Sequence, residues 1–193
     1  DILRINNSVL FGVGWWQFQN PPNFYTRLLL KNVLSRKLNH SVRDSYTVEM
    51  LSKLGLNNVI NTHCPTMWPF MNTNLNNIPP KKSKNVLIMI TDYNKKPSNE
   101  KKLFDLLSRN YNYIYFWPQG SKDLIYFKEL KIDYPIKILG GSIQDLDKLL
   151  KSDISLDYIG TRLHGGIRCL LNLRRSLILQ VDNRAKEISK DTG

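Results

Sequence analysis

Residues 84–117 read KNVLIMITDYNKKPSNEKKLFDLLSRNYNYIYFW, and this stretch decides the fold. The run VLIMIT at 86–91 predicts a strand, Ser98 can cap a helix that continues to about Arg109, and YIYFW at 113–117 predicts a second strand. Strands that are apolar along their whole length are typical of a parallel sheet with helices on both faces. The stretch therefore predicts a strand, helix and strand in a layered α/β fold.

The same alternation continues on the carboxyl side. We expect a helix capped by Ser121, a strand, a helix capped by Ser142, a short strand, a helix and a closing strand, at about 122–130, 136–139, 143–151, 158–160, 163–172 and 176–181. Five such strands form a Rossmann-like sheet. Ligands of these sheets bind beyond the carboxyl ends of the strands, so the candidate sites are the turns 92–97, 118–123, 140–142, 161–165 and 182–186.

The first eighty residues also alternate between strand and helix. We expect a buried strand at 8–14 (SVLFGVG), a helix over 27–38, an extended piece at 41–43, a helix over 45–54 stopped by Gly55, a strand at 58–62 and a Pro- and Asn-rich linker at 65–80. The sequence thus predicts a partial N-terminal α/β domain at 1–80 and a C-terminal Rossmann-like domain at 81–193.

Composition and charge narrow the class of protein. The 41% hydrophobic fraction excludes a disordered chain, and no apolar run has the ~18 residues of a membrane span. Lys and Arg number 28 against 16 Asp and Glu, a net charge of +12 that suits nucleic acid, an anionic membrane surface, or a phosphorylated or carboxylated substrate. Cys64 and Cys169 stand apart from any metal-ligand pattern, which predicts no metal site and a reducing, cytoplasmic compartment.

The sharpest motif is GTRLHGG at 160–166, in a strand-to-helix turn. A helix start attracts anions, Arg162 offers a bidentate guanidinium, His164 can move a proton, and Gly165 and Gly166 allow close approach. These are the components of a phosphate and carboxylate site. The structural alternative is that Arg162 pairs with a carboxylate, His164 caps the turn and the glycines permit packing of the helix on the sheet.

A second cluster is SVRDS at 41–45, where Arg43 could reach an anion while Asp44 or Ser45 caps the following helix. Its structural alternative is a surface arginine beside a capping aspartate. The segment around Trp15 and Trp16 follows the first expected strand and could form the wall of a carbohydrate site.

SVRD followed by a helix and LGLNNV, then DYIGTRLHGGIRCLL and an apolar strand ending in DNRAKEI, resembles the polysaccharide pyruvyl transferase family. The resemblance implies a two-domain, glycosyltransferase-B-like fold with an incomplete N-terminal domain here. It also implies an enzyme that transfers pyruvate from phosphoenolpyruvate to a pair of sugar hydroxyls as a ketal, in the biosynthesis of surface polysaccharide or exopolysaccharide. By position, the family's donor-binding and catalytic residues are Arg43, Arg162, His164 and Lys186, with Gly165 and Gly166 beside them.

This chemistry matches the residues, because phosphoenolpyruvate carries a carboxylate and a phosphate that arginines and a helix start can bind. The expected partners are phosphoenolpyruvate and a saccharide or lipid-linked glycan acceptor, with no other cofactor, no metal and no nucleic acid, and with peripheral contact to an anionic membrane as an option.

Two alternatives stay open. In a nucleotide-sugar glycosyltransferase we would expect an acidic residue near the 160–168 turn, and this segment has none. A non-enzymatic basic module that binds polyanions predicts basic residues on one face with exposed aromatics, whereas the lysines here are scattered.

Overall fold

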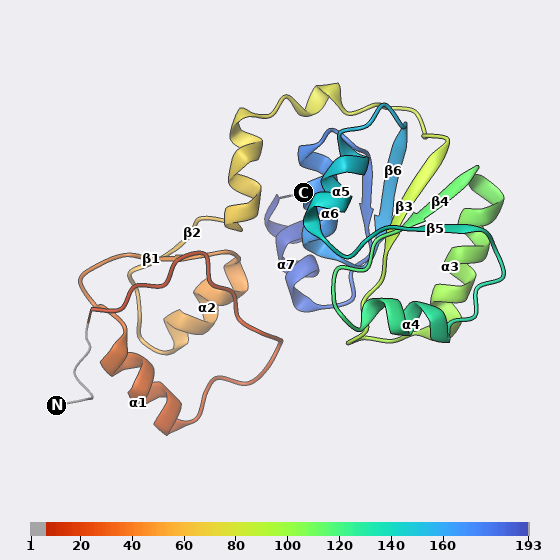
Figure 1. The fold of residues 1–193 in the computed structure, drawn as a ribbon. Coiled ribbons are helices and arrows are strands. Elements are labelled where there is room, and N and C mark those ends of the chain that lie inside the picture. Colours follow the sequence, from red (N-terminus) through yellow and green to blue (C-terminus); the bar gives the residue numbers. More distant parts are fainter. Residues whose placement is uncertain (1–6, 193) are drawn as a thin grey trace. The chain divides into compact units, whose positions relative to one another are not determined.

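The computed structural model describes residues 7–192, which divide into two compact units (Figure 1). Unit 1 comprises the described residues of Asp1–Trp68 together with those of Asp182–Gly193, and unit 2 comprises Pro69–Val181. The chain therefore leaves unit 1, builds all of unit 2 and then returns to unit 1.

Unit 2 contains a five-stranded parallel sheet, as the alternating pattern predicts. The strands lie in the order β5 (Ile136–Ile138), β4 (Tyr113–Phe116), β3 (Asn85–Met89), β6 (Leu156–Gly160) and β7 (Ser176–Ile178), and every neighbouring pair is parallel. The first strand of this unit in the chain is central, the next two lie on one side of it and the last two on the other. This is a doubly wound, Rossmann-like order, and its direction changes between β3 and β6.

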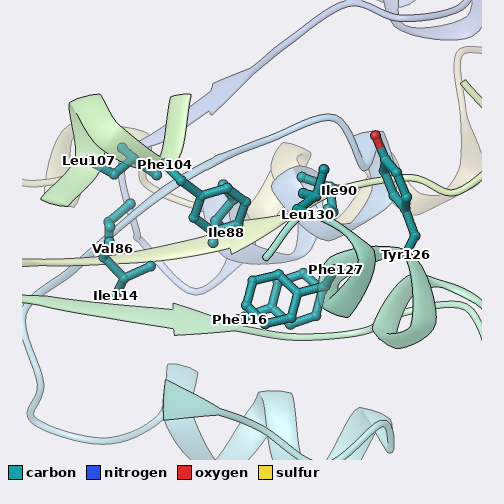
Figure 2. Close-up of a cluster of buried hydrophobic side chains, with 10 residues drawn as sticks. All are labelled: Val86, Ile88, Ile90, Phe104, Leu107, Ile114, Phe116, Tyr126, Phe127 and Leu130. Atoms are coloured by element: carbon teal, nitrogen blue, oxygen red, sulfur yellow. The ribbon is translucent and has the colours of Figure 1, made fainter. Parts of the chain in front are cut away.

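Helices cover both faces of this sheet because β3 is apolar and buried from Val86 to Met89. Val86, Ile88 and Ile90 pack in one cluster with side chains of α3 (Pro97–Asn110) and α4 (Asp123–Glu129), as Figure 2 shows. Leu87 and Met89 point to the opposite face and pack with α5 (Ile143–Leu150) and α6 (Leu163–Leu171). Successive side chains of a strand alternate between faces, so one continuous apolar run supplies both cores.

The structure confirms one of the three predicted caps in this unit and corrects two. Ser142 caps α5 in a capping box with Asp145. Ser98 is not a cap, because Pro97 starts α3 one residue earlier and its fixed φ suits that position. Ser121 is not a cap either, because the turn before α4 is closed by Asp123, whose Oδ2 accepts from the N–H of Gly120 at 2.7 Å.

Unit 1 pairs two short parallel strands, β1 (His40–Val42) and β2 (Val59–Asn61), with helices around them. Its core contains Leu34, Val42, Leu51, Leu54 and Leu56. The helices are α1 (Phe24–Val33), α2 (Ser45–Lys53) and α7 (Asn183–Thr192); the expected linker holds two 3₁₀ helices, η1 (Pro65–Asn72) and η2 (Leu75–Asn77), of which η1 begins in unit 1.

The predicted buried strand at 8–14 is wrong. The segment forms only isolated bridges, Ser8 with Leu34 and Val13 with Val42, and Phe11 is 68% exposed. The N–H groups of Ser41 and Arg43 donate to the carbonyls of Leu10 and Val13, so two residues of β1 face three of the segment. Gly12, with a φ of +62°, lies at this bulge and interrupts the ladder. Within residues 7–192, no helix has both the length and the apolar character needed to cross a membrane.

Candidate functional site

The switch point of the five-stranded sheet gathers polar residues from three strand-to-helix turns of unit 2. Thr91 and Asp92 follow β3, Asp123 begins α4 after β4, and Thr161 and Arg162 follow β6. The N–H of Thr161 donates to the carbonyl of Met89 at 2.9 Å, which holds the ends of β6 and β3 together. The site therefore lies where ligands of doubly wound sheets bind.

Arg162 is the centre of this site, and its guanidinium is already paired. Its Nη2 donates to Oδ1 of Asp123 and lies 3.4 Å from Oδ1 of Asp92. Its Cζ lies 5.2 Å from the centre of the Tyr93 ring, at a distance typical of a cation–π contact. The structural alternative for Arg162, pairing with a carboxylate, is thus part of the observed geometry.

Three buried polar atoms around the switch point have no hydrogen-bond partner within residues 7–192. They are Oγ1 of Thr91, Oγ1 of Thr161 and Nε of Arg162. A buried donor or acceptor left without a partner costs about 1–3 kcal/mol, and more when the group is charged. Such groups usually indicate water or a ligand. A bound water or ligand would satisfy each of these groups.

The start of α6 adds further donors to this turn. The first N–H groups of a helix have no intrahelical partner, and the side chain of Arg162, the N-cap residue, does not cap them. His164 lies half-buried in this first turn. Burial raises the pKa of Tyr158 well above its usual value, and the neutral hydroxyl donates to the carbonyl of Arg162 at 2.7 Å. The backbone beneath the predicted site is therefore fixed.

Gly165 and Gly166 serve the packing of α6 on the sheet. A Cβ on Gly165 would overlap Sδ of the buried Met89. A Cβ on Gly166 would lie 2.5 Å from Cγ1 of Ile178 and 2.8 Å from Cε1 of Tyr158. Both glycines are buried, so their packing role is observed, and their part in binding the donor stays a prediction.

Arg43 and Lys186 lie in unit 1, not in unit 2 with Arg162. Arg43 passes over Gly14, where any Cβ would overlap the guanidinium, and its Nε lies 3.4 Å from Oδ2 of Asp44. Asp44 caps α2 as expected. Lys186 is an exposed residue of α7, with Nζ 5.3 Å from the centre of the Phe18 ring. That Arg43, Lys186 and Arg162 bind one donor stays a prediction.

Thr91, Asp92 and Asp123 are site residues that the sequence motifs did not indicate. Both aspartates stand in the candidate turns 92–97 and 118–123, so the position in a strand-to-helix turn was the available signal. The segment 160–168 carries no carboxylate, yet the fold brings two carboxylates to it from other turns. The absence of an acidic residue near this turn is therefore not an argument against the glycosyltransferase alternative.

Comparisons with known proteins identify the family. Searches of curated proteins and of solved structures give no significant match. The family model described as polysaccharide pyruvyl transferase matches residues 2–183, which include the switch-point site and the start of α7. With the fold and nearly the whole chain in agreement, the protein belongs to the polysaccharide pyruvyl transferase family and is a transferase.

Proposed function

We propose that this protein transfers the pyruvyl group of phosphoenolpyruvate to two hydroxyls of a saccharide and forms a cyclic ketal. The observation that carries the donor assignment is the buried Nε of Arg162, the N-cap residue of α6, which has no partner within residues 7–192. The hydroxyl of Thr161, the preceding residue, also has none there. A phosphate or carboxylate supplies acceptor oxygens for these donors, and phosphoenolpyruvate carries both groups.

The reaction needs one proton delivered and two hydroxyl protons removed. The methylene carbon of the donor gains a proton and becomes a methyl group, which leaves a positive centre at the neighbouring carbon. One sugar hydroxyl attacks this carbon, phosphate leaves, and the second hydroxyl closes the ring. The two hydroxyl protons balance the proton on the methyl group and the one that leaves with phosphate.

His164 is the residue of this turn suited to proton transfer. It stands in the first turn of α6, two positions after Arg162, and an imidazole can both accept and donate a proton. A general acid or base is typically worth ~10² to 10⁴ in rate. Arg162 instead holds the negative groups of the donor, so the two side chains contribute to different steps. Arg43 and Lys186 are the proposed donor-binding residues of unit 1.

The test is release of phosphate from phosphoenolpyruvate in the presence of saccharide or lipid-linked glycan acceptors. His164→Gln should lower turnover at least about a hundredfold and leave phosphoenolpyruvate affinity within about threefold. Arg162→Lys should weaken the affinity itself, because an ammonium cannot replace the planar guanidinium. Near-normal turnover of a folded His164→Gln protein would refute the role of His164. Release of nucleoside diphosphate from a nucleotide sugar, with no use of phosphoenolpyruvate, would favour the glycosyltransferase alternative.

A further inference from the structure

We propose that Asp123 is a positioning residue, which holds the guanidinium of Arg162 in the orientation that binds the donor. This inference rests on the proposed function, because it assigns to Asp123 a role in binding the donor of that reaction. Asp123 lies outside the motif at 160–166 and precedes Arg162 by 39 residues in the chain.

The carboxylate of Asp123 is held more firmly than that of any other partner of Arg162 in the described chain. Its side chain is 0% exposed, and both oxygens are used. Oδ2 accepts from the N–H of Gly120 at 2.7 Å, and Oδ1 accepts from Nη2 of Arg162 and from the N–H of Asp92 at 3.3 Å. Asp92 itself is 25% exposed and reaches Arg162 only at 3.4 Å.

These contacts occupy Nη2, one of the three nitrogens of the guanidinium. Nη2 is taken by the two carboxylates, while Nε is buried and lacks a partner in the described residues. The Tyr93 ring lies against the guanidinium, 5.2 Å from its Cζ. An arginine pre-oriented in this way loses less side-chain entropy when a ligand binds, so Asp123 increases donor affinity by orientation.

A positioning role predicts that loss of the Asp123 carboxylate changes donor affinity in the direction opposite to that expected from its charge alone. Replacing Asp123 by Asn removes one negative charge next to an anion site, and electrostatics alone would strengthen the binding of phosphoenolpyruvate. Loss of orientation would weaken it. The direction of the change in Kd therefore separates the two effects.

The experiment measures Kd for phosphoenolpyruvate and for inorganic phosphate by calorimetry on the whole chain. We expect Asp123→Asn to raise the Kd for phosphoenolpyruvate about tenfold. Asp147→Asn is the matched control. Asp147 of α5 pairs with Arg168 of α6, the helix that Arg162 precedes, through bonds of 2.7 and 2.6 Å. Asp147→Asn should reduce thermal stability and leave Kd unchanged.

Coupling to Arg162 distinguishes positioning from a general structural role. In an Arg162→Lys background, Asp123→Asn should change Kd by less than about twofold, whereas a structural role would persist there. An unchanged or lower Kd in Asp123→Asn alone, or an undiminished effect in the Arg162→Lys background, would overturn the assignment. No binding of phosphoenolpyruvate by the wild-type chain would refute the proposed function and the assignment together.

If Asp123→Asn does not fold, the wild-type chain provides the test. The ¹⁵N–¹H resonance of the Arg162 Nε, identified by its loss in Arg162→Lys, should be sharp without ligand and should shift when phosphoenolpyruvate is added. A resonance lost to rapid exchange in the free protein would show an unrestrained guanidinium and would overturn the proposal.

Discussion

Adding one methyl group at Gly166 tests whether the second glycine of the RLHGG motif serves packing. In Gly166→Ala the new Cβ would lie 2.5 Å from Cγ1 of Ile178 and 2.8 Å from Cε1 of Tyr158. Tyr158 is 1% exposed, so its ring has little room to move. Such overpacking typically costs about 1–3 kcal/mol, while Ala gains about 1 kcal/mol over Gly within a helix. We expect a net loss of up to about 2 kcal/mol in the free energy of unfolding.

Urea denaturation followed by far-ultraviolet circular dichroism measures this loss, and a double-mutant cycle assigns its cause. Ile178→Ala removes the atom nearest to the new methyl group, so Gly166→Ala should cost at least about 0.5 kcal/mol less in that background. An equal cost in both backgrounds, or a more stable Gly166→Ala protein, would refute the packing argument. A stable Gly166→Ala protein that no longer bound phosphoenolpyruvate would indicate that Gly166 belongs to the ligand site.

Three further outcomes follow from contacts outside the site. Arg174→Ala should lower the free energy of unfolding by about 2–4 kcal/mol in urea, because its guanidinium donates to three carbonyls between α5 and β6; the exposed Arg109→Ala should change it by less than about 0.5 kcal/mol. The pKa of Asp191 lies below its usual value, because burial acts to raise it but hydrogen bonds from Ser45 and Asn61 outweigh burial. The stabilisation is therefore present above the unfolded pKa of about 3.9 and is lost as pH falls through the lower folded pKa, so melting curves of wild type and Asp191→Asn should converge at low pH. Burial raises the pKa of Cys169 to about 12, so its thiol should react with a disulfide reagent at pH 8 only after unfolding; rapid labelling of the native protein would contradict this.

The fold of unit 2 could be predicted because its strands carry their own signal. The apolar run at 86–91 and the aromatic run at 113–117 each need two covered faces, and parallel strands flanked by helices provide them. The segment at 8–14 is equally apolar, but the positive φ of Gly12 prevents a regular ladder. Helix α7 was not predicted because it is mostly polar, and its buried residues Ala185 and Ile188 give only a weak period.

The candidate site was predicted only in part, because the ion pairs of Arg162 depend on the order of the strands in the sheet. Arg162 and His164 share one turn with recognisable chemistry, so the sequence points to them directly. Asp92 and Asp123 lie 70 and 39 residues from Arg162, and they reach it because β4, β3 and β6 are neighbours in the sheet. A sequence alone does not give that order, and each aspartate alone resembles an ordinary turn residue.

The return of α7 to unit 1 has a consequence for how the chain folds. Asp191 accepts from the N–H of Ser45, 146 residues earlier, and Asn183 donates to the carbonyl of Trp15, 168 residues earlier. Unit 2 is continuous, so all of its contacts can form once Val181 has been synthesised. Unit 1 has to close a loop that contains the whole of unit 2, and contacts so distant in sequence form slowly. During synthesis the part of unit 1 that precedes unit 2 therefore completes its structure after unit 2, and its apolar residues depend longer on protection from aggregation.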